Sequence, residues 1–264
     1  MKRTPALELR DVSYVANGKK ILDSINWTVQ PGEHWAILGP NGSGKTTLLR
    51  IASGYLWPNR GGEVYRKGET LTHLPELRKS IGWVTASLVS EIPIQERALN
   101  TVVSGKFAQI GYLGGYWGQA SSYDYTCARR YLKELGSENL TEQEFGTLSQ
   151  GEQQKVLIAR ARMTKPYLII LDEPCAGMDP GARESFLASL CKLGAQKKIP
   201  ALIYVTHHIE EILPIFAKTL VMKDGKVLHS GKTQEVLKPR VLQELYGASL
   251  SLIRRKGRYW PVIE

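Results

Sequence analysis

The sequence predicts an α/β fold with a mainly parallel sheet, and three observations point to it. A glycine-rich loop at residues 39–46 lies between a strand-like apolar run and a helix-like segment. Two further apolar runs, residues 167–171 and 201–206, are each followed at once by titratable side chains. Continuous apolar strands of this kind are typical of a parallel sheet buried on both faces, and ligands bind at the carboxyl ends of such strands.

Length and composition are those of a globular protein of 264 residues, with 42% hydrophobic and 23% charged side chains, which argues against disorder. No apolar run approaches the roughly 20 residues of a membrane-spanning helix, and the amino terminus lacks the apolar stretch of a signal peptide. Cys127, Cys175 and Cys191 lack metal-ligand spacing and suit a reducing compartment. We therefore expect a cytoplasmic protein.

The formal net charge of +10 has two explanations. One is an anionic partner, such as nucleic acid or the inner surface of a membrane, and the other is a solvated basic face. Lysines and arginines are scattered, with the densest group at residues 254–258, so the charge favours a solvated face.

Short alternating runs at residues 7–12 and 25–29, with a turn at Asn17-Gly18 between them, predict antiparallel strands ahead of the loop. Tyr14 follows the first run. It is placed either to stack on a base or to fill a half-buried strand position, and the sequence leaves both open.

The glycine-rich loop matches the phosphate-binding pattern G-x-x-x-x-G-K-[ST]. Its glycines let successive N–H groups point at phosphate oxygens, and the following helix adds the positive end of its dipole. Lys45 is expected to reach the β- and γ-phosphates, Thr46 to ligate Mg²⁺ and Thr47 to hold the α-phosphate end. The predicted nucleotide-binding residues of the loop are Gly39, Asn41, Gly42, Ser43, Gly44, Lys45, Thr46 and Thr47.

Helical patterns dominate from about residue 88 to 148, as at 96–107 and 123–135, and predict a helical subdomain inserted between strands of the core. A glycine- and aromatic-rich segment at 111–118 interrupts them and is predicted to be a surface loop. Its aromatic side chains either dock a partner or pack against the subdomain, and both remain open.

Ser149 and Glu152 have the spacing of a capping box and predict a helix that runs to about residue 164. Gly151 lies in the first turn, where glycine costs about 1 kcal/mol relative to alanine. A glycine here lets a ligand come close to the helix N-terminus, where the helix dipole favours an anion.

Asp172 and Glu173 end an apolar run at the expected ligand edge of the sheet. One carboxylate can hold Mg²⁺ through water, and the next can orient or deprotonate an attacking water. Asp179 then caps a helix that has Pro180 at its first position. The sequence thus predicts a magnesium site beside a general base.

The apolar run at 201–206 delivers His207 and His208 to the same edge. Adjacent side chains alternate on an extended chain, so at most one of the two histidines is expected to face the phosphates. Further along, the pattern predicts strands at 219–222 and 226–229, followed by a short helical tail.

In this order and spacing, the motifs resemble those of ATP-binding-cassette (ABC) ATPases over nearly the whole chain. The resemblance implies a P-loop NTPase core with an N-terminal antiparallel β-subdomain and an inserted α-helical subdomain, all in one domain. The implied parts are a core with its β-subdomain at 1–87 and 149–240, a helical subdomain at about 88–148 and a C-terminal tail at 241–264.

The resemblance also implies roles for single residues. Tyr14 would stack on adenine, Glu173 would be the general base, and Lys45 and His207 would stabilise charge on the γ-phosphate. Such cassettes work as head-to-tail dimers, as a homodimer or with a second cassette, that sandwich ATP. Ser149 and Gly151 would contact the ATP bound to the other subunit, and Asp179 is implied to be a further nucleotide-binding residue.

The sequence departs from the family pattern at two places. Gln150 and Glu152 stand where the family's signature segment has glycine and glutamine. Ala86 stands where the family places a glutamine that touches Mg²⁺, so we expect Thr46, the phosphates and waters oriented by Asp172 to hold the metal.

The expected activity is Mg²⁺-dependent ATP hydrolysis that powers transport through separate transmembrane permease subunits, with the chain bound peripherally to the inner face of the membrane. Three segments, residues 84–87, 205–212 and 257–260, are similar to bacterial cassettes related to molybdate-transport ATPases. The alternatives are a soluble ATPase of this family acting on nucleic acid or the ribosome, and a nucleotide-dependent regulator. A single phosphate loop and no long coiled coil count against the first, and no specific nucleic-acid partner is expected.

Overall fold

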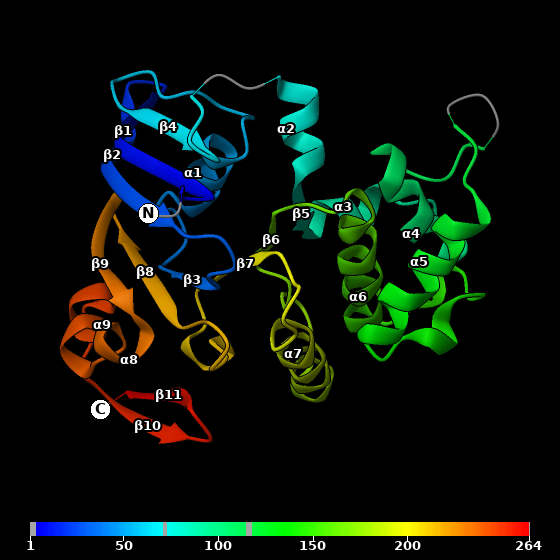
Figure 1. Cartoon of the computed structure of the whole chain (residues 1–264). Coiled ribbons are helices and arrows are strands. Elements are labelled where there is room, and N and C mark those ends of the chain that lie inside the picture. Colours follow the sequence, from blue (N-terminus) through cyan, green and yellow to red (C-terminus); the bar gives the residue numbers. More distant parts are fainter. Residues whose placement is uncertain (1–3, 71–72, 115–117, 264) are drawn as a thin grey trace. The chain divides into compact units, whose positions relative to one another are not determined.

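The computed structural model describes residues 4–70, 73–114 and 118–263 (Figure 1). They form two compact units, one made of Met1–Arg78 with Pro200–Glu264 and the other of Lys79–Ile199. Residues 115–117 of the predicted glycine- and aromatic-rich loop lie outside the described residues. The two alternatives for that loop therefore stay predictions.

The first unit opens with the predicted antiparallel sheet, in the strand order β2-β1-β4. Asn17 and Gly18 join the first two strands with φ angles of 50° and 73°. A two-residue loop with both residues left-handed matches the twist of the flanking strands, which explains the hairpin at this point. The strands are β1 (Leu7–Ala16), β2 (Lys19–Val29) and β4 (Glu63–Arg66).

The same unit holds the predicted parallel strands, with β3 (Trp35–Leu38) between β7 (Ala201–Thr206) and β8 (Lys218–Lys223). Every residue of β3 and β7 is buried, as their continuous apolar sequence predicts. Leu38 and Thr206 are register neighbours. The glycine-rich loop, which leads to α1 (Lys45–Ala52), and the His207 segment therefore leave adjacent strands at the same edge.

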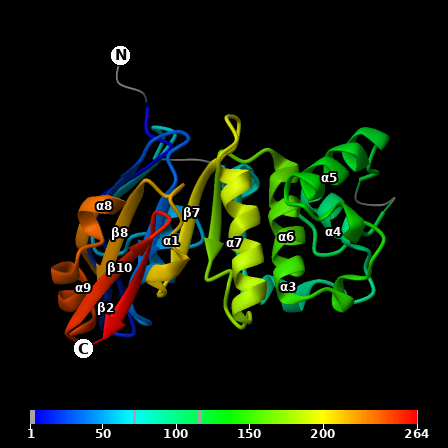
Figure 2. The same ribbon diagram turned by 90° about the horizontal axis from the view of Figure 1, so that it is seen from below.

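In the second unit, β5 (Ile81–Thr85) pairs in parallel with β6 (Leu168–Asp172). The predicted helical patterns at 96–107 and 123–135 correspond to α4 and α5. Helix α6 packs against α4, α5, α7 and β5, and Figure 2 shows it beside α7. The helices are α3 (Ala86–Glu91), α4 (Ala98–Ser104), α5 (Ser122–Glu134), α6 (Gln150–Ala161) and α7 (Pro180–Gly194).

The C-terminal tail is only partly helical, so the prediction of a short helical tail was wrong for its last part. Strand β9 (Lys226–Lys232) leads into α8 (Thr233–Val236) and α9 (Pro239–Tyr246). A hairpin of β10 (Leu250–Arg255) and β11 (Arg258–Ile263) follows. Lys256 and Gly257 turn it with φ angles of 48° and 76°, which ends any helix and closes a tight hairpin.

Among the described residues, no helix is both long and apolar enough to span a bilayer.

Candidate nucleotide-binding site

The backbone of the phosphate loop requires glycine at two positions. Gly44 has a φ of 97°, which is costly for any residue with a side chain. At Gly39, an added Cβ would lie 2.4 Å from the Met222 carbonyl oxygen and 2.7 Å from Ser43 Oγ. The loop thus passes so close to β8 that only bare backbone fits there.

Lys45 is buried and bends back over its own loop. Its Nζ donates to the carbonyl oxygens of Gly39 at 2.8 Å and Pro40 at 3.0 Å. A buried ammonium needs such partners because an uncompensated charge in the interior is very costly. The loop is therefore built to keep a positive charge against its backbone.

The residues of the loop fit an anion with several oxygens. Ser43 Oγ is buried and has no hydrogen-bond partner among the described residues. Helix α1 begins at Lys45, and its N-cap residue, Gly44, makes no side-chain cap hydrogen bond; the first turn has no acidic residue. Thr46 is exposed and Thr47 is half-buried in that turn. An uncapped helix N-terminus beside a buried orphan hydroxyl suits phosphate, and an exposed hydroxyl suits Mg²⁺.

Tyr14 lies half-buried on β1, opposite Leu22 of β2. This environment is compatible with a base on its ring and with packing alone, so stacking on adenine stays a prediction.

His207 follows the last residue of β7, and its segment is tied to the buried Glu211. Tyr204 Oη and Thr206 Oγ1 donate to Glu211 Oε2 at 2.9 and 2.6 Å. The His208 backbone N–H donates to Thr206 Oγ1 at 2.9 Å. Two buried hydroxyls on one carboxylate fix the path of the chain just beyond the strand.

The two histidine rings do not alternate as they would on a strand. The ring centroids of His207 and His208 are 4.1 Å apart, with an interplanar angle of 39°. The strand ends at Thr206 and the chain bends, so the periodicity of an extended chain does not apply to them.

The second unit carries the two predicted acids at the end of β6. Glu173 has a φ of 49°, in the left-handed region that a residue with a side chain adopts at a cost of roughly 1–2 kcal/mol. The Ala176 backbone N–H donates to the Glu173 carbonyl oxygen at 3.1 Å and closes the turn. Strained backbone of this kind is found at functional sites, but also in the hairpin turns at Asn17 and Lys256, so the role of Glu173 stays a prediction.

Asp172 has a polar neighbour that the sequence did not suggest. This neighbour is Thr85 of β5, its register partner. Thr85 Oγ1 accepts a hydrogen bond from the Leu88 backbone N–H at 3.3 Å and lies 2.9 Å from Ser87 Oγ. Thr85 caps α3, so Ala86 is already the first helical residue. The alanine methyl group offers no metal ligand where the family pattern has a glutamine.

The predicted capping box at the start of α6 is confirmed. The Ser149 backbone N–H and Oγ donate to Glu152 Oε2 at 2.9 and 2.7 Å, and Ser149 Oγ accepts from the Glu152 backbone N–H at 3.4 Å. An added Cβ at Gly151 would meet nothing closer than 3.7 Å. Packing within the unit therefore does not require glycine at 151, and the approach of a ligand to this helix end stays a prediction.

Asp179 is the predicted cap of α7. Its Oδ1 accepts hydrogen bonds from the backbone N–H groups of Gly181 and Ala182 at 2.8 and 3.0 Å. This role accounts for the aspartate structurally, so contact with nucleotide stays a prediction.

The predicted residues are divided between the two units. The first unit brings the phosphate loop and His207 to neighbouring strand ends, and in the second Asp172 is the register partner of Thr85, with Glu173 next along the chain. Thr85 was missed, although a threonine ahead of a helical run is a signal for a helix cap.

Residues 22–176 match the family described as ABC transporter. Uncharacterized ABC transporter ATP-binding protein YlmA of Bacillus subtilis is 38% identical over 255 residues, which are 96% of this chain and 95% of that protein. ABC transporter ATP-binding protein ModF of Escherichia coli is 35% identical over 76% of this chain and 40% of its own length.

Solved structures agree with these relatives. The cbiO1 subunit from Clostridium perfringens, part of the ABC transporter complex cbiONQ, superposes with a TM-score of 0.78 at 27% identity, covering 91% of this chain and 94% of that one. MJ0796, described as a dimeric bacterial ABC transporter cassette, gives a TM-score of 0.70 at 27% identity over 86% and 98% of the two chains. The chain belongs to the ATP-binding subunits of ABC transporters, a family of ATP-hydrolysing cassettes with the P-loop α/β fold.

Proposed function

We propose that this chain hydrolyses ATP with the residues identified above and powers transport through separate transmembrane subunits, bound to the inner face of the membrane. The observation that carries the proposal is the phosphate loop, in which buried Lys45, orphan Ser43 Oγ and the uncapped start of α1 are held together. Each of these features favours the binding of phosphate, and membership of the family indicates that the phosphates are those of ATP.

Nucleotide binding is assigned to the loop residues, with Lys45 at the β- and γ-phosphates and Tyr14 against the adenine. Thr46 and Asp172 supply the hydroxyl and the carboxylate that would hold Mg²⁺, directly or through water. When bound, Mg²⁺ would neutralise charge on the phosphates. The chain supplies no glutamine at position 86, so the metal would be held by Thr46, the phosphates and waters that Asp172 orients.

Hydrolysis is assigned to Glu173 and His207. Glu173 would accept the proton of the attacking water, and its left-handed backbone turns it away from the line of β6. His207 and Lys45 would stabilise charge on the γ-phosphate in the transition state.

A head-to-tail dimer is the arrangement in which Ser149 and Gly151 contact the nucleotide of the other subunit. Support comes from the exposed position of Ser149 at the N-terminus of α6, from the glycine at 151, which packing within the unit does not require, and from the dimeric MJ0796 cassette. The membrane partners are supported by the cbiO1 relative, which belongs to a transporter complex.

The test is Glu173→Gln, which removes the base and leaves the loop untouched. We expect ATP binding to persist, turnover to fall by about 10²- to 10⁴-fold, and ATP to trap a dimer on size-exclusion chromatography. Glu69→Gln makes the same chemical change at an exposed position and should behave as the wild type. Rapid turnover by Glu173→Gln would exclude Glu173 as the base.

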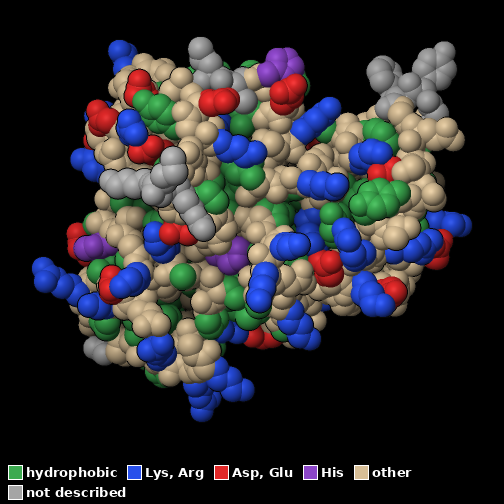
Figure 3. Space-filling model, viewed as in Figure 1, with side chains coloured by type: hydrophobic (Ala, Val, Ile, Leu, Met, Phe, Trp, Pro, Cys, Tyr) green, Lys and Arg blue, Asp and Glu red, His purple; other side chains and the backbone are tan. Residues whose placement is uncertain are grey.

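The alternative functions find less support. Lysine and arginine side chains are spread over the face shown in Figure 3, which suits a solvated basic surface better than a nucleic-acid site. The relatives compared are named as transporter proteins, which does not favour a role on the ribosome. Measurable turnover by the wild type would exclude a purely regulatory chain.

A further inference from the structure

The C-terminal segment reaches back to the stretch of chain that carries His207. Tyr246, the last residue of α9, donates from its Oη to the His207 carbonyl oxygen at 3.1 Å. Arg258, the first residue of β11, donates from Nε at 2.8 Å and also from Nη2 to the Glu210 carbonyl oxygen. Strand β11 packs against the short helix at Ile209–Glu211.

These bonds are made to different groups of the segment from those that Glu211 binds. Glu211 fixes the segment through the side chains of Tyr204 and Thr206, whereas Tyr246 and Arg258 bind main-chain carbonyl oxygens. The backbone from 206 to 211 is therefore held from within the core by one set of bonds and from the C-terminal segment by another.

Both donors are held in place by their own surroundings. The Arg258 guanidinium lies over the Trp260 ring, 5.1 Å from its centroid. An added Cβ on the adjacent Gly257 would lie 3.0 Å from Pro214 Cγ, so the hairpin turn sits directly on the chain that follows the short helix. Burial, with the negative charge of Glu210 adding to it, raises the pKa of Tyr246 to about 12, which keeps its hydroxyl protonated as a donor.

We propose that Tyr246 and Arg258 are positioning residues that set the place of His207 for hydrolysis, so that the C-terminal segment takes part in the catalytic cycle without touching ATP. The proposal rests on the function assigned to His207 above. It follows from the sensitivity of transition-state contacts to position, since a displacement of about 1 Å can cost about 10²-fold in rate.

The first test separates turnover from nucleotide binding. Tyr246→Phe removes one hydrogen bond from the segment and Arg258→Met removes two, and we expect each to lower kcat by about 3- to 10-fold. The Kd for ATP should stay within about twofold, because the Lys45 loop makes none of these contacts. Tyr123→Phe and Arg255→Met are matched controls at exposed positions and should keep wild-type kcat.

A double-mutant cycle shows whether the effect passes through His207. If the C-terminal residues act by positioning His207, Tyr246→Phe should cost nothing further in a His207→Ala background. An equal loss in both backgrounds would overturn the proposal. A wild-type kcat in His207→Ala would exclude His207 from hydrolysis and would overturn both the proposed role of His207 and this inference. A lowered kcat in His207→Ala, together with wild-type kcat in Tyr246→Phe and Arg258→Met, would overturn this inference alone.

One further measurement is independent of turnover, and a conservative variant adds a rescue of kcat. Hydrogen exchange of the backbone amides at 208–212 should become faster in Tyr246→Phe and Arg258→Met, with exchange in α1 unchanged. Arg258→Lys keeps a cationic donor and should recover part of the loss seen with Arg258→Met. Because Tyr246→Phe removes a single oxygen atom, it tests the proposal even if Arg258→Met lowers the yield of folded protein.

Discussion

The Lys45 ammonium nitrogen lies 2.8 Å from the carbonyl oxygen of Gly39, so the first glycine and the lysine of the loop are joined directly. The contact holds a buried charge at the start of α1, next to the orphan hydroxyl of Ser43. The contacts that stabilise the loop therefore also hold a positive charge and a hydroxyl group in place for phosphate binding.

Lys45→Ala should weaken nucleotide binding itself. A hydrogen bond to a charged group is worth about 1.5–3 kcal/mol, so we expect the Kd for ATP to rise by roughly 10- to 150-fold. Titration with a fluorescent ATP analogue measures this, and Lys19→Ala, at an exposed position, is the control. Unchanged affinity would contradict the placement of Lys45 at the phosphates.

Asp172→Asn should raise the Mg²⁺ requirement. Replacing a carboxylate near the metal by an amide typically weakens metal binding by about 10- to 100-fold, while ATP binding without metal should be preserved. The Mg²⁺ concentration for half-maximal turnover and the Mg²⁺ dependence of the ATP Kd both report this. Asp11→Asn, at an exposed position of β1, should leave both values unchanged.

Two substitutions at Ser149 separate its cap from its proposed contact with ATP. Ser149→Ala removes the side-chain acceptor and should lower the unfolding free energy by about 1 kcal/mol, visible as a lower urea midpoint. Ser149→Asp keeps a capping oxygen but places a negative charge where phosphate is expected.

The new carboxylate would lie beside that of Glu152, to which Ser149 Oγ donates at 2.7 Å, so the unfolding free energy of Ser149→Asp should resemble that of Ser149→Ala, not that of the wild type. Ser149→Asp should nevertheless lose ATP-induced dimerisation more completely than Ser149→Ala. A Ser149→Asp protein that dimerises normally with ATP would restrict Ser149 to its structural role.

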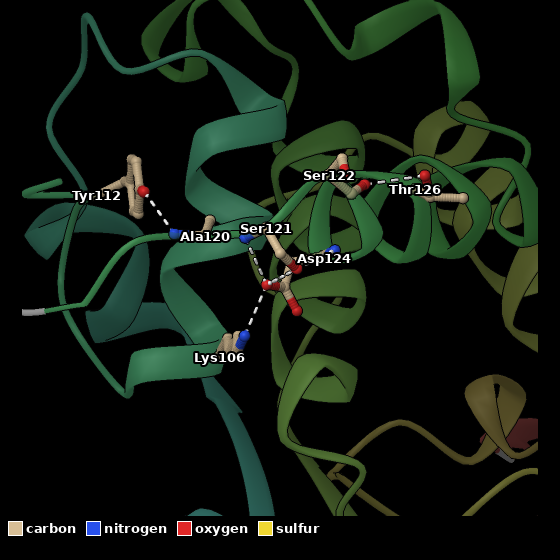
Figure 4. Close-up of polar contacts among 7 residues, drawn as sticks. All are labelled: Lys106, Tyr112, Ala120, Ser121, Ser122, Asp124 and Thr126. Atoms are coloured by element: carbon tan, nitrogen blue, oxygen red, sulfur yellow. Dashed lines mark hydrogen bonds and ion pairs between the residues drawn. The ribbon is translucent and has the colours of Figure 1, made fainter. Parts of the chain in front are cut away.

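Asp124 should contribute stability that is lost in acid. Figure 4 shows its carboxylate between Lys106 Nζ at 2.6 Å and Ser121, whose backbone N–H and Oγ donate at 2.8 and 2.7 Å. Burial pushes the pKa of Asp124 upward, but the bonds from Lys106 and Ser121 outweigh it and hold the pKa below its ordinary value.

Because the folded pKa is lowered, the contribution is complete above the unfolded value of about 3.9 and falls as the pH drops through the folded pKa. Asp124→Asn should thus lower the unfolding free energy at pH 7 by about 1–3 kcal/mol, which is measured as a lower urea midpoint. The difference in unfolding free energy between Asp124→Asn and the wild type should become smaller below pH 4. A difference in unfolding free energy between the two proteins that stays constant down to pH 2.5 would contradict this account. Thr126→Ala, nearby on the exposed side of α5, is the control.

Local features of the site could be predicted from sequence because their causes are local. The capping box at Ser149, the cap at Asp179 and the hairpin at Asn17-Gly18 each depend on residues a few positions apart. The phosphate loop is likewise one continuous stretch whose glycines have a backbone purpose. Spacing along the chain is enough to specify such features.

Features that join distant parts of the chain could not be found this way. Tyr246 and His207 are 39 residues apart, Arg258 and Glu210 are 48 apart, and nothing in the spacing links them. The helical tail was mispredicted for the same reason, because its final strands are stabilised by pairing with each other and by packing against residues 209–211.

The sequence by itself determined the α/β class, the order of the motifs and the residue types that the chemistry needs, since these depend on apolar periodicity, glycine and helix caps. The tertiary structure decided which partners those residues have. It placed Thr85 beside Asp172, turned Glu173 into a left-handed conformation and brought the C-terminal segment to the His207 loop. Strand register and long-range hydrogen bonds are set by packing of the whole unit, and no local pattern carries that information.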